Sequence, residues 1–155
     1  MSLEVVKFDE LVLRQETEDV EIPVPGDIKL LVAQMIHTMV EANGLGLAAP
    51  QVDRSERLFV AVLGESYHVF INPVIVEKSD AQSTDKEACL SLPGVVVKVR
   101  RPKIVWVTYY DAAGVLHERK KFKRMHARVV QHEIDHLAGK LITDYADGFQ
   151  FKAED

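Results

Sequence analysis

Two histidines near the C-terminus, His132 and His136, stand four positions apart in the sequence His-Glu-Ile-Asp-His. On an α-helix, side chains four residues apart lie one above the other on the same face. Both imidazoles can therefore bind one metal ion, with the carboxylate of Glu133 beside the first of them. This H-E-x-x-H arrangement is typical of metal sites in which the glutamate acts as general base. The alternative is an amphipathic helix with two incidental histidines and a solvated Glu133, because short motifs also occur by chance.

A catalytic site of this kind needs a third protein ligand and one open position. The extended metzincin motif would place a third histidine at position 142, which is Ile142. The best candidate is Cys89, the only thiol, which lies upstream in the segment Glu-Ala-Cys-Leu-Ser. The alternative for Cys89 is a small buried apolar residue. One thiolate and two imidazoles suit Fe(II), Zn(II), Co(II) or Ni(II) and exclude Mg(II) and Ca(II).

The N-terminal third of the chain is predicted to hold an arm, a helix and a loop. Residues 1–25 predict an extended arm, because prolines and a glycine interrupt residues 20–26. A helix is predicted over residues 27–43, with Asp27 as its N-cap, because apolar residues recur at helical spacing. Residues 44–51, Gly-Leu-Gly-Leu-Ala-Ala-Pro-Gln, are too rich in glycine and alanine for an ordinary strand or helix. They predict a tight loop whose backbone is closely approached by another group.

The rest of the chain predicts strands and then a second helix. Apolar, β-branched and aromatic runs predict strands over 58–63, 67–71, 74–76, 95–99 and 104–110. Residues 111–114 predict a hairpin turn into a strand over 115–122. The last helix is predicted over 124–138, ending at Gly139. The predicted fold class is therefore α+β, a mainly antiparallel sheet packed on a C-terminal metal-binding helix with one N-terminal amphipathic helix.

Length and composition limit the class of protein. The chain has 155 residues, of which 47% are hydrophobic and 28% charged, so one globular domain over residues 1–155 is expected. The net charge of −5 gives no indication of a nucleic-acid partner, and we expect no DNA binding. A single cysteine indicates a reducing compartment. No signal peptide or membrane span is evident, so we expect a cytoplasmic or organelle-interior protein, and a monomer.

Three segments in this order, Gly-Leu-Gly-Leu-Ala-Ala-Pro-Gln, Glu-Ala-Cys-Leu-Ser and His-Glu-Ile-Asp-His, closely resemble the three motifs of peptide deformylases. The resemblance covers nearly the whole chain. It implies a hydrolase of protein biosynthesis that removes the N-formyl group from N-formylmethionyl nascent peptides. It also implies that Cys89, His132 and His136 hold one divalent transition metal, with Fe(II) expected as the native ion and Zn(II), Ni(II) or Co(II) as substitutes.

The resemblance further implies a role for the residues around the metal. A metal-bound hydroxide attacks the formyl carbon, and Glu133 takes the proton of the water and delivers it to the departing amine. The side-chain amide of Gln51 and the backbone N–H of Leu90 stabilise the oxyanion. The peptide binds like an added strand, and an apolar pocket receives the first methionine. The implied substrate-binding residues are Gly44, Leu45, Gly46, Glu87, Ala88, Met125 and Val129.

Three residues depart from the pattern of the family. Ala88 stands where glycine is usual, which costs about 1 kcal/mol if φ there is positive. Arg124 and His126 stand where glycine and an apolar residue are usual, beside the expected methionine pocket. These departures leave open a related metalloamidase with a different acyl or peptide preference. A homologue that binds formylated N-termini without turnover is another alternative, against which the intact Glu133 and Gln51 argue.

The resemblance leaves contact with the ribosome open. Some bacterial members dock through a long C-terminal helix, whereas this chain is expected to lack that helix, so any contact is expected to be transient. Residues 119–124, Arg-Lys-Lys-Phe-Lys-Arg, offer a basic segment that suits rRNA. The favoured alternative is a solvated strand edge that lysines protect from aggregation.

Overall fold

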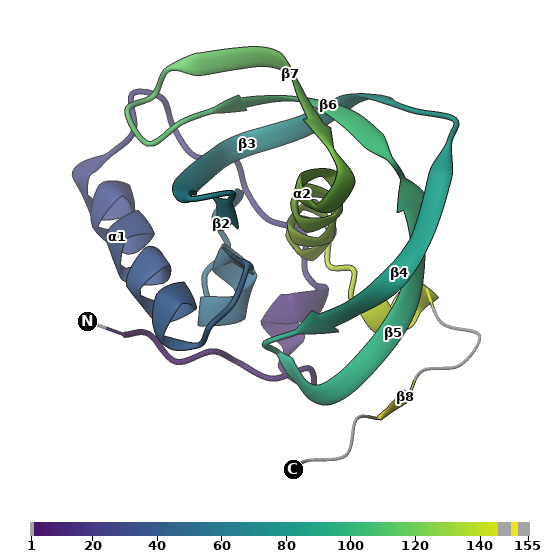
Figure 1. The fold of residues 1–155 in the computed structure, drawn as a ribbon. Helices are drawn as coiled ribbons and strands as arrows, with labels where there is room; N and C mark the ends of the chain where they lie inside the picture. The colour runs from purple at the N-terminus through teal and green to yellow at the C-terminus, as the bar shows by residue number, and fades with distance from the viewer. Residues whose placement is uncertain (1, 146–149, 152–155) are drawn as a thin grey trace.

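A computed structural model describes residues 2–145 and 150–151 of the chain, and it confirms the α+β fold class (Figure 1). Its helices are α1 (Gly26–Glu41) and α2 (Arg124–Leu137), with three short 3-10 helices η1 (Leu11–Arg14), η2 (Ala49–Val52) and η3 (Ile142–Tyr145). Its strands are β1 (Gly46–Ala48), β2 (Leu58–Leu63), β3 (Ser66–Lys78), β4 (Gln82–Cys89), β5 (Leu92–Pro102), β6 (Ile104–Tyr110), β7 (Leu116–Lys123) and β8 (Gln150–Phe151).

The strands form two antiparallel sheets around α2. The larger sheet has the order β1-β2-β3-β6-β7, and the smaller has the order β4-β5-β8. Figure 1 shows α2 at the centre of the molecule, with β2 and β3 on one side and β4 and β5 on the other. Strands β1 and β4 are each the edge of their sheet. The helix that carries the H-E-x-x-H sequence therefore lies between two sheets, each with a free edge.

Strand β2 is buried on both faces, which explains its uninterrupted apolar sequence. Leu58 and Val60 belong to the core that packs against α1, whereas Phe59 and Ala61 belong to the core that packs against α2. A strand that is covered on both faces carries apolar residues at successive positions instead of alternating polar and apolar ones. The predicted bounds of 58–63 are confirmed for this reason.

Helix α1 differs from its prediction at its first residue. The predicted N-cap, Asp27, is wrong, because the helix begins at Gly26 and Pro25 occupies the N-cap position. Asp27 instead lies in the first turn, where its charge faces the positive end of the helix dipole. The helix ends at Glu41, and Asn43 follows it in the left-handed conformation with φ of 56°. The helix thus ends two residues before its predicted end, and Asn43 is one of the few residues that tolerate the left-handed conformation.

Two further predictions, one of a loop and one of two separate strands, were wrong. Residues 44–51 are not wholly a loop, because Gly46–Ala48 forms the short strand β1 paired with β2, and η2 follows directly. Residues 67–71 and 74–76 belong to a single strand, β3, which bends at Asn72 with φ of 51°. The side chain of Asn72 pairs with the backbone of Val20 in both directions, at 2.8 and 2.9 Å. This contact ties the bend in β3 to the N-terminal arm.

Strand β4 has no counterpart among the predicted elements. Its sequence, Gln-Ser-Thr-Asp-Lys-Glu-Ala-Cys, is polar, and only Glu87 and Cys89 are buried. The strand forms because it pairs along its length with β5, from Gln82 opposite Pro102 to Cys89 opposite Leu92. Cys89 therefore sits at the end of an edge strand rather than in a loop.

Helix α2 matches its prediction closely at both ends. It begins at Arg124 and ends at Leu137, one residue before the predicted end. Gly139 follows with φ of 76°, and a Cβ at this position would lie 2.6 Å from the carbonyl oxygen of Arg14. Glycine is therefore required where the chain leaves the helix. Among the described residues, neither helix has the length and apolar character needed to cross a membrane.

Backbone conformation distinguishes Ala88 from Arg124, two of the residues that depart from the pattern of the family. Ala88 lies within β4 and is not among the described residues with positive φ, so alanine there carries no left-handed strain. Arg124 has φ of 57° and does carry this strain, which costs a residue with a Cβ about 1 kcal/mol. Its backbone N–H donates to the carbonyl of Lys103 at 3.2 Å.

Candidate metal centre and active site

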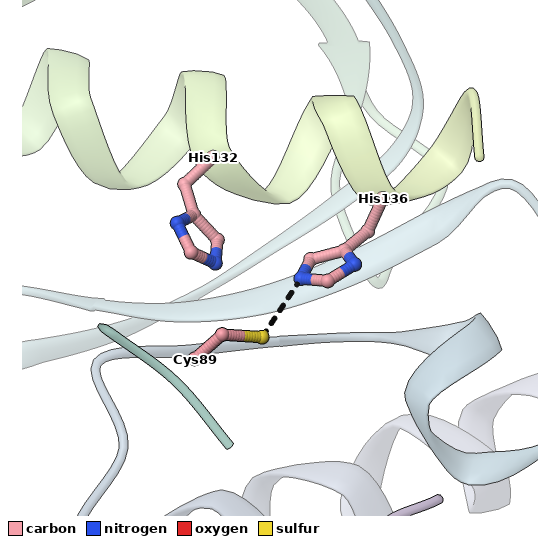
Figure 2. Close-up of side chains that lie close together, drawn as sticks. All are labelled: Cys89, His132 and His136. Atoms are coloured by element: carbon pink, nitrogen blue, oxygen red, sulfur yellow. Dashed lines mark hydrogen bonds between the residues drawn. The ribbon is translucent and has the colours of Figure 1, made fainter. Parts of the chain in front are cut away.

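Three candidate metal ligands converge at the face of α2. His132 and His136 project from the same side of the helix toward Cys89 (Figure 2). The donor atoms of the three residues all lie within 4.8 Å of one another, and Cys89 Sγ is 3.3 Å from His136 Nε2. An ion that binds sulfur at about 2.3 Å and nitrogen at about 2.1 Å needs separations of this order. The three residues therefore fit a single transition-metal ion.

His132 is oriented for metal binding by a carboxylate behind it. Its Nδ1 is hydrogen-bonded to Glu87 Oε1 at 2.8 Å, which leaves Nε2 on the side of Cys89. A carboxylate on the outer nitrogen of a metal-binding imidazole sets its tautomer and raises its basicity. The side chain of Glu87, which the resemblance assigned to the substrate, is thus committed to His132. The structure favours a role for Glu87 in orienting this ligand.

Two arginines neutralise Glu87 from the opposite side. Arg101 donates to both carboxylate oxygens, at 2.7 and 2.9 Å, and Arg128 Nη1 donates to Oε2 at 2.7 Å. Burial alone would raise the pKa of Glu87, but the hydrogen bonds from Arg101 and His132 lower it to about 2. Glu87 is therefore a stable carboxylate, although only 7% of the residue is exposed.

Arg101 was not among the predicted site residues. It is 3% exposed and also donates to Asp135 at 2.9 Å and to the Tyr145 hydroxyl at 3.1 Å. Its position continues the inward-facing series of β5, in which every second residue is buried: Val95, Val97, Val99 and Arg101. An arginine at a core-facing strand position needs a buried anion. That alternation is the signal in the sequence that could have identified it.

The charges on the two histidines are set by different neighbours. Burial alone would lower the pKa of His132, but its contacts with Cys89 and Glu87 raise it to about 10. Burial, together with the positive charge on His132, holds the pKa of His136 well below its usual value. A metal ion that binds here must therefore displace a proton from His132, since a ligand nitrogen has to be unprotonated.

Glu133 lies at the floor of the site. It is 4% exposed, and its Oε2 is 4.0 Å from His132 Nε2. Within the part of the chain that the structure describes, Glu133 Oε1 has no hydrogen-bond partner. Burial is the main cause that raises the pKa of Glu133 to about 7. A carboxylate that titrates near neutrality and has one oxygen without a hydrogen-bond partner is suited to accept and return a proton.

Gln51 approaches the same point from η2. Its Nε2 is 3.5 Å from Cys89 Sγ, and the residue is 1% exposed. The carboxamide nitrogen thus faces the candidate metal ligands, as its predicted role requires. Leu90 follows Cys89 in the turn between β4 and β5 and lines the adjoining cavity. The role of its backbone N–H stays a prediction.

A cavity of about 390 Å³ opens in front of these residues. It lies between the edge strands β1 and β4, with Glu133, His132 and Gln51 in its wall. The cavity brings together all the residues implied in substrate binding: Gly44, Leu45, Gly46, Glu87, Ala88, Met125 and Val129. Arg124 and His126 are exposed and do not belong to the described lining.

Comparison with known proteins agrees with this geometry. The family model described as polypeptide deformylase matches residues 2–152. A peptide deformylase of Dictyoglomus turgidum is 42% identical over 146 residues, which cover 94% of each chain. The structure of the Thermotoga maritima peptide deformylase has a TM-score of 0.91 and 36% identity, over 96% of this chain and 99% of that one. A Met-Ala-Ser-bound peptide deformylase of Acinetobacter baumannii has a TM-score of 0.89 and 32% identity, over 94% and 99% respectively.

Proposed function

The chain belongs to the polypeptide deformylase family, and we propose that it removes the N-formyl group from N-formylmethionyl peptides of nascent proteins by metal-dependent hydrolysis. One observation supports this proposal above the others. The donor atoms of Cys89, His132 and His136 converge beside Glu133 and Gln51 in the wall of one open cavity. A ligand set, an acid/base and an oxyanion donor are the groups that hydrolysis of an amide requires.

Cys89, His132 and His136 would hold one divalent ion, for which we propose Fe(II) as the native metal. When bound, such an ion polarises a carbonyl oxygen and lowers the pKa of water. Glu133 accepts the proton that the attacking water loses and delivers it to the departing amine nitrogen. Its buried carboxylate, with a pKa raised to about 7, suits both transfers.

Negative charge develops on the formyl oxygen as water adds. The Gln51 side-chain N–H and the Leu90 backbone N–H donate to this oxygen in the proposed mechanism. Both residues line the cavity, and Gln51 is held in place by its own hydrogen bonds before any substrate arrives. Donors held in advance need no reorganisation during the reaction.

The peptide would lie along the free edge of β1, opposite β4. Backbone pairing at a strand edge accepts varied sequences, as an enzyme acting on many nascent chains requires. Leu45, Met125 and Val129 offer an apolar surface to the first methionine. The bound Met-Ala-Ser of the Acinetobacter baumannii structure supports a substrate of this class. We further propose a monomeric, single-domain enzyme that works in the cytoplasm, or in an organelle of a eukaryote.

Formate release from formyl-Met-Ala-Ser tests this function. The metal-loaded protein should release formate, and a chelator should abolish the release. Metal-loaded protein without turnover would refute the proposal. Acetyl-Met-Ala-Ser, assayed in parallel, tests for a different acyl preference. The structure gives that alternative no support, because Arg124 and His126 face solvent and Ala88 is unstrained.

Because Gly46 has no side chain, the Glu133 carboxylate has room beside it. A Cβ at Gly46 would lie 2.5 Å from Glu133 Oε2 and 2.8 Å from its Cδ, closer than such atoms can approach. We expect Gly46→Ala to displace the carboxylate and to lower kcat about 10- to 100-fold, since a displacement near 1 Å is worth up to about 10²-fold. Gly26→Ala is the matched control, because a Cβ there meets nothing within 4 Å. Equal kcat values for both variants would contradict the assigned position of Glu133.

A further inference from the structure

We propose that Ser91 is a positioning residue whose hydroxyl holds the Gln51 carboxamide so that one N–H faces the substrate oxygen. This inference rests on the proposed function, because it concerns how the oxyanion donor is held. Ser91 is 0% exposed and follows Leu90 in the turn between β4 and β5. Gln51 Nε2 donates to Ser91 Oγ at 3.2 Å.

The orientation of the Gln51 carboxamide follows from its hydrogen bonds. Gln51 Oε1 accepts the backbone N–H of Ala48 at 2.9 Å. A backbone N–H only donates, so it must face the oxygen of the amide and not its nitrogen. The nitrogen therefore lies on the opposite side, toward Ser91 and Cys89.

The two N–H groups of Gln51 have unequal partners. One donates to Ser91 Oγ, a good hydroxyl acceptor. The other points toward Cys89 Sγ at 3.5 Å, and sulfur is a weak acceptor. This second N–H faces the candidate metal ligands, and it is the one that a substrate oxygen can engage. Ser91 occupies the first N–H and so leaves the second directed into the site.

Removal of the Ser91 hydroxyl would loosen the orientation of the Gln51 carboxamide. The terminal torsion of a glutamine side chain has a broad energy profile, so its orientation depends on its hydrogen-bond partners. The Ala48 N–H would still hold the oxygen, but the nitrogen would lose a buried acceptor. The productive orientation would then be populated only part of the time.

The backbones of both residues are held by the N-terminal arm. The N–H of Val6 donates to the Gln51 carbonyl at 2.8 Å, and the N–H of Phe8 donates to the Ser91 carbonyl at 3.0 Å. Gln51 and Ser91 belong to different elements, η2 and the β4–β5 turn. The arm keeps these elements at a constant separation, so the Ser91 hydroxyl can act as a defined support for the amide.

A double-mutant cycle tests this role on the metal-loaded enzyme. We expect Ser91→Ala to lower kcat roughly 3- to 10-fold, the effect of one lost hydrogen bond, with KM and metal content close to wild type. In the Gln51→Ala background, Ser91→Ala should have little further effect, because the group it positions is gone. Thr108→Val is the matched control, since its hydroxyl oxygen accepts the Arg119 N–H on β7, away from the site. Equal losses in both Gln51 backgrounds would overturn the proposal.

The side-chain amide signals in a nuclear magnetic resonance spectrum give a second readout, which does not depend on turnover. In the Zn(II)-loaded protein, Ser91→Ala should shift the Gln51 amide protons and speed their exchange with solvent. Gln131 is the internal control, because its buried amide donates to Pro102 and Ala127 instead. An unchanged Gln51 signal would overturn the contact itself. Wild-type protein without formate release would instead overturn the proposed function and, with it, the catalytic importance of Ser91.

Discussion

Replacement of Glu133 by alanine is expected to lower kcat by about two to four orders of magnitude while one metal ion remains bound. The loss follows because no other described carboxylate lines the cavity except Glu87, which is held by Arg101, Arg128 and His132. Metal is retained because Glu133 is not one of the convergent donors. Formate release and elemental analysis on the same sample measure both quantities.

Two comparison variants separate chemistry from packing for Glu133. Glu133→Gln keeps the volume and the buried position but cannot accept the proton, so it should be about as inactive as Glu133→Ala. Glu118→Ala removes an exposed carboxylate from β7 and should leave kcat unchanged. Near-normal activity of either Glu133 variant would refute its role as acid/base.

Replacement of Glu87 by glutamine is expected to weaken metal binding about 10- to 100-fold, since the outer partner of a metal-binding histidine contributes this much. Stability should fall as well, by about 3–5 kcal/mol, because Arg101 and Arg128 would lose the buried anion that neutralises them. Metal dissociation constants from chelator competition, and denaturant unfolding of the metal-free protein, measure the two effects separately.

The control for Glu87 is a carboxylate–arginine pair on the surface. Glu77 accepts from Arg119 at 2.6 Å, but both side chains are about half exposed. Glu77→Gln should change stability by no more than about 1 kcal/mol and leave metal affinity unaltered. Similar losses for the two variants would show that the position of Glu87 behind His132 has no special consequence.

The basic segment over residues 119–124 had two interpretations, a contact with rRNA and a protected strand edge. Residues 119–123 belong to β7, the far edge of the larger sheet, and Arg124 begins α2; all six residues except Phe122 are exposed. Lys121 lies over the ring of Trp106, and Arg119 pairs with Glu77. These contacts fit the favoured interpretation of a protected strand edge. Contact with rRNA stays the untested alternative.

The sequence by itself predicted which residues form the candidate site. The spacing of His132 and His136 defines a shared helix face, because helical periodicity is local and regular. The strands over 58–63 and 104–110 were predicted with their observed bounds, since their apolar and β-branched residues specify extended structure within a few positions. The three motifs then supplied Cys89, Glu133 and Gln51, which the structure brings to one cavity.

Only the tertiary structure decided how these residues are supported. The polar strand β4 exists because β5 pairs with it, and its mostly exposed residues carry no apolar pattern that would mark a strand in the sequence. Glu87 accepts from His132 and is also held by Arg101, on β5, and Arg128, on α2. These residues come from elements far apart in the chain. Ser91 meets Gln51 for the same reason. Contacts of this kind depend on how elements pack, so the motifs could predict which candidate residues gather at the cavity but not the residues that support them.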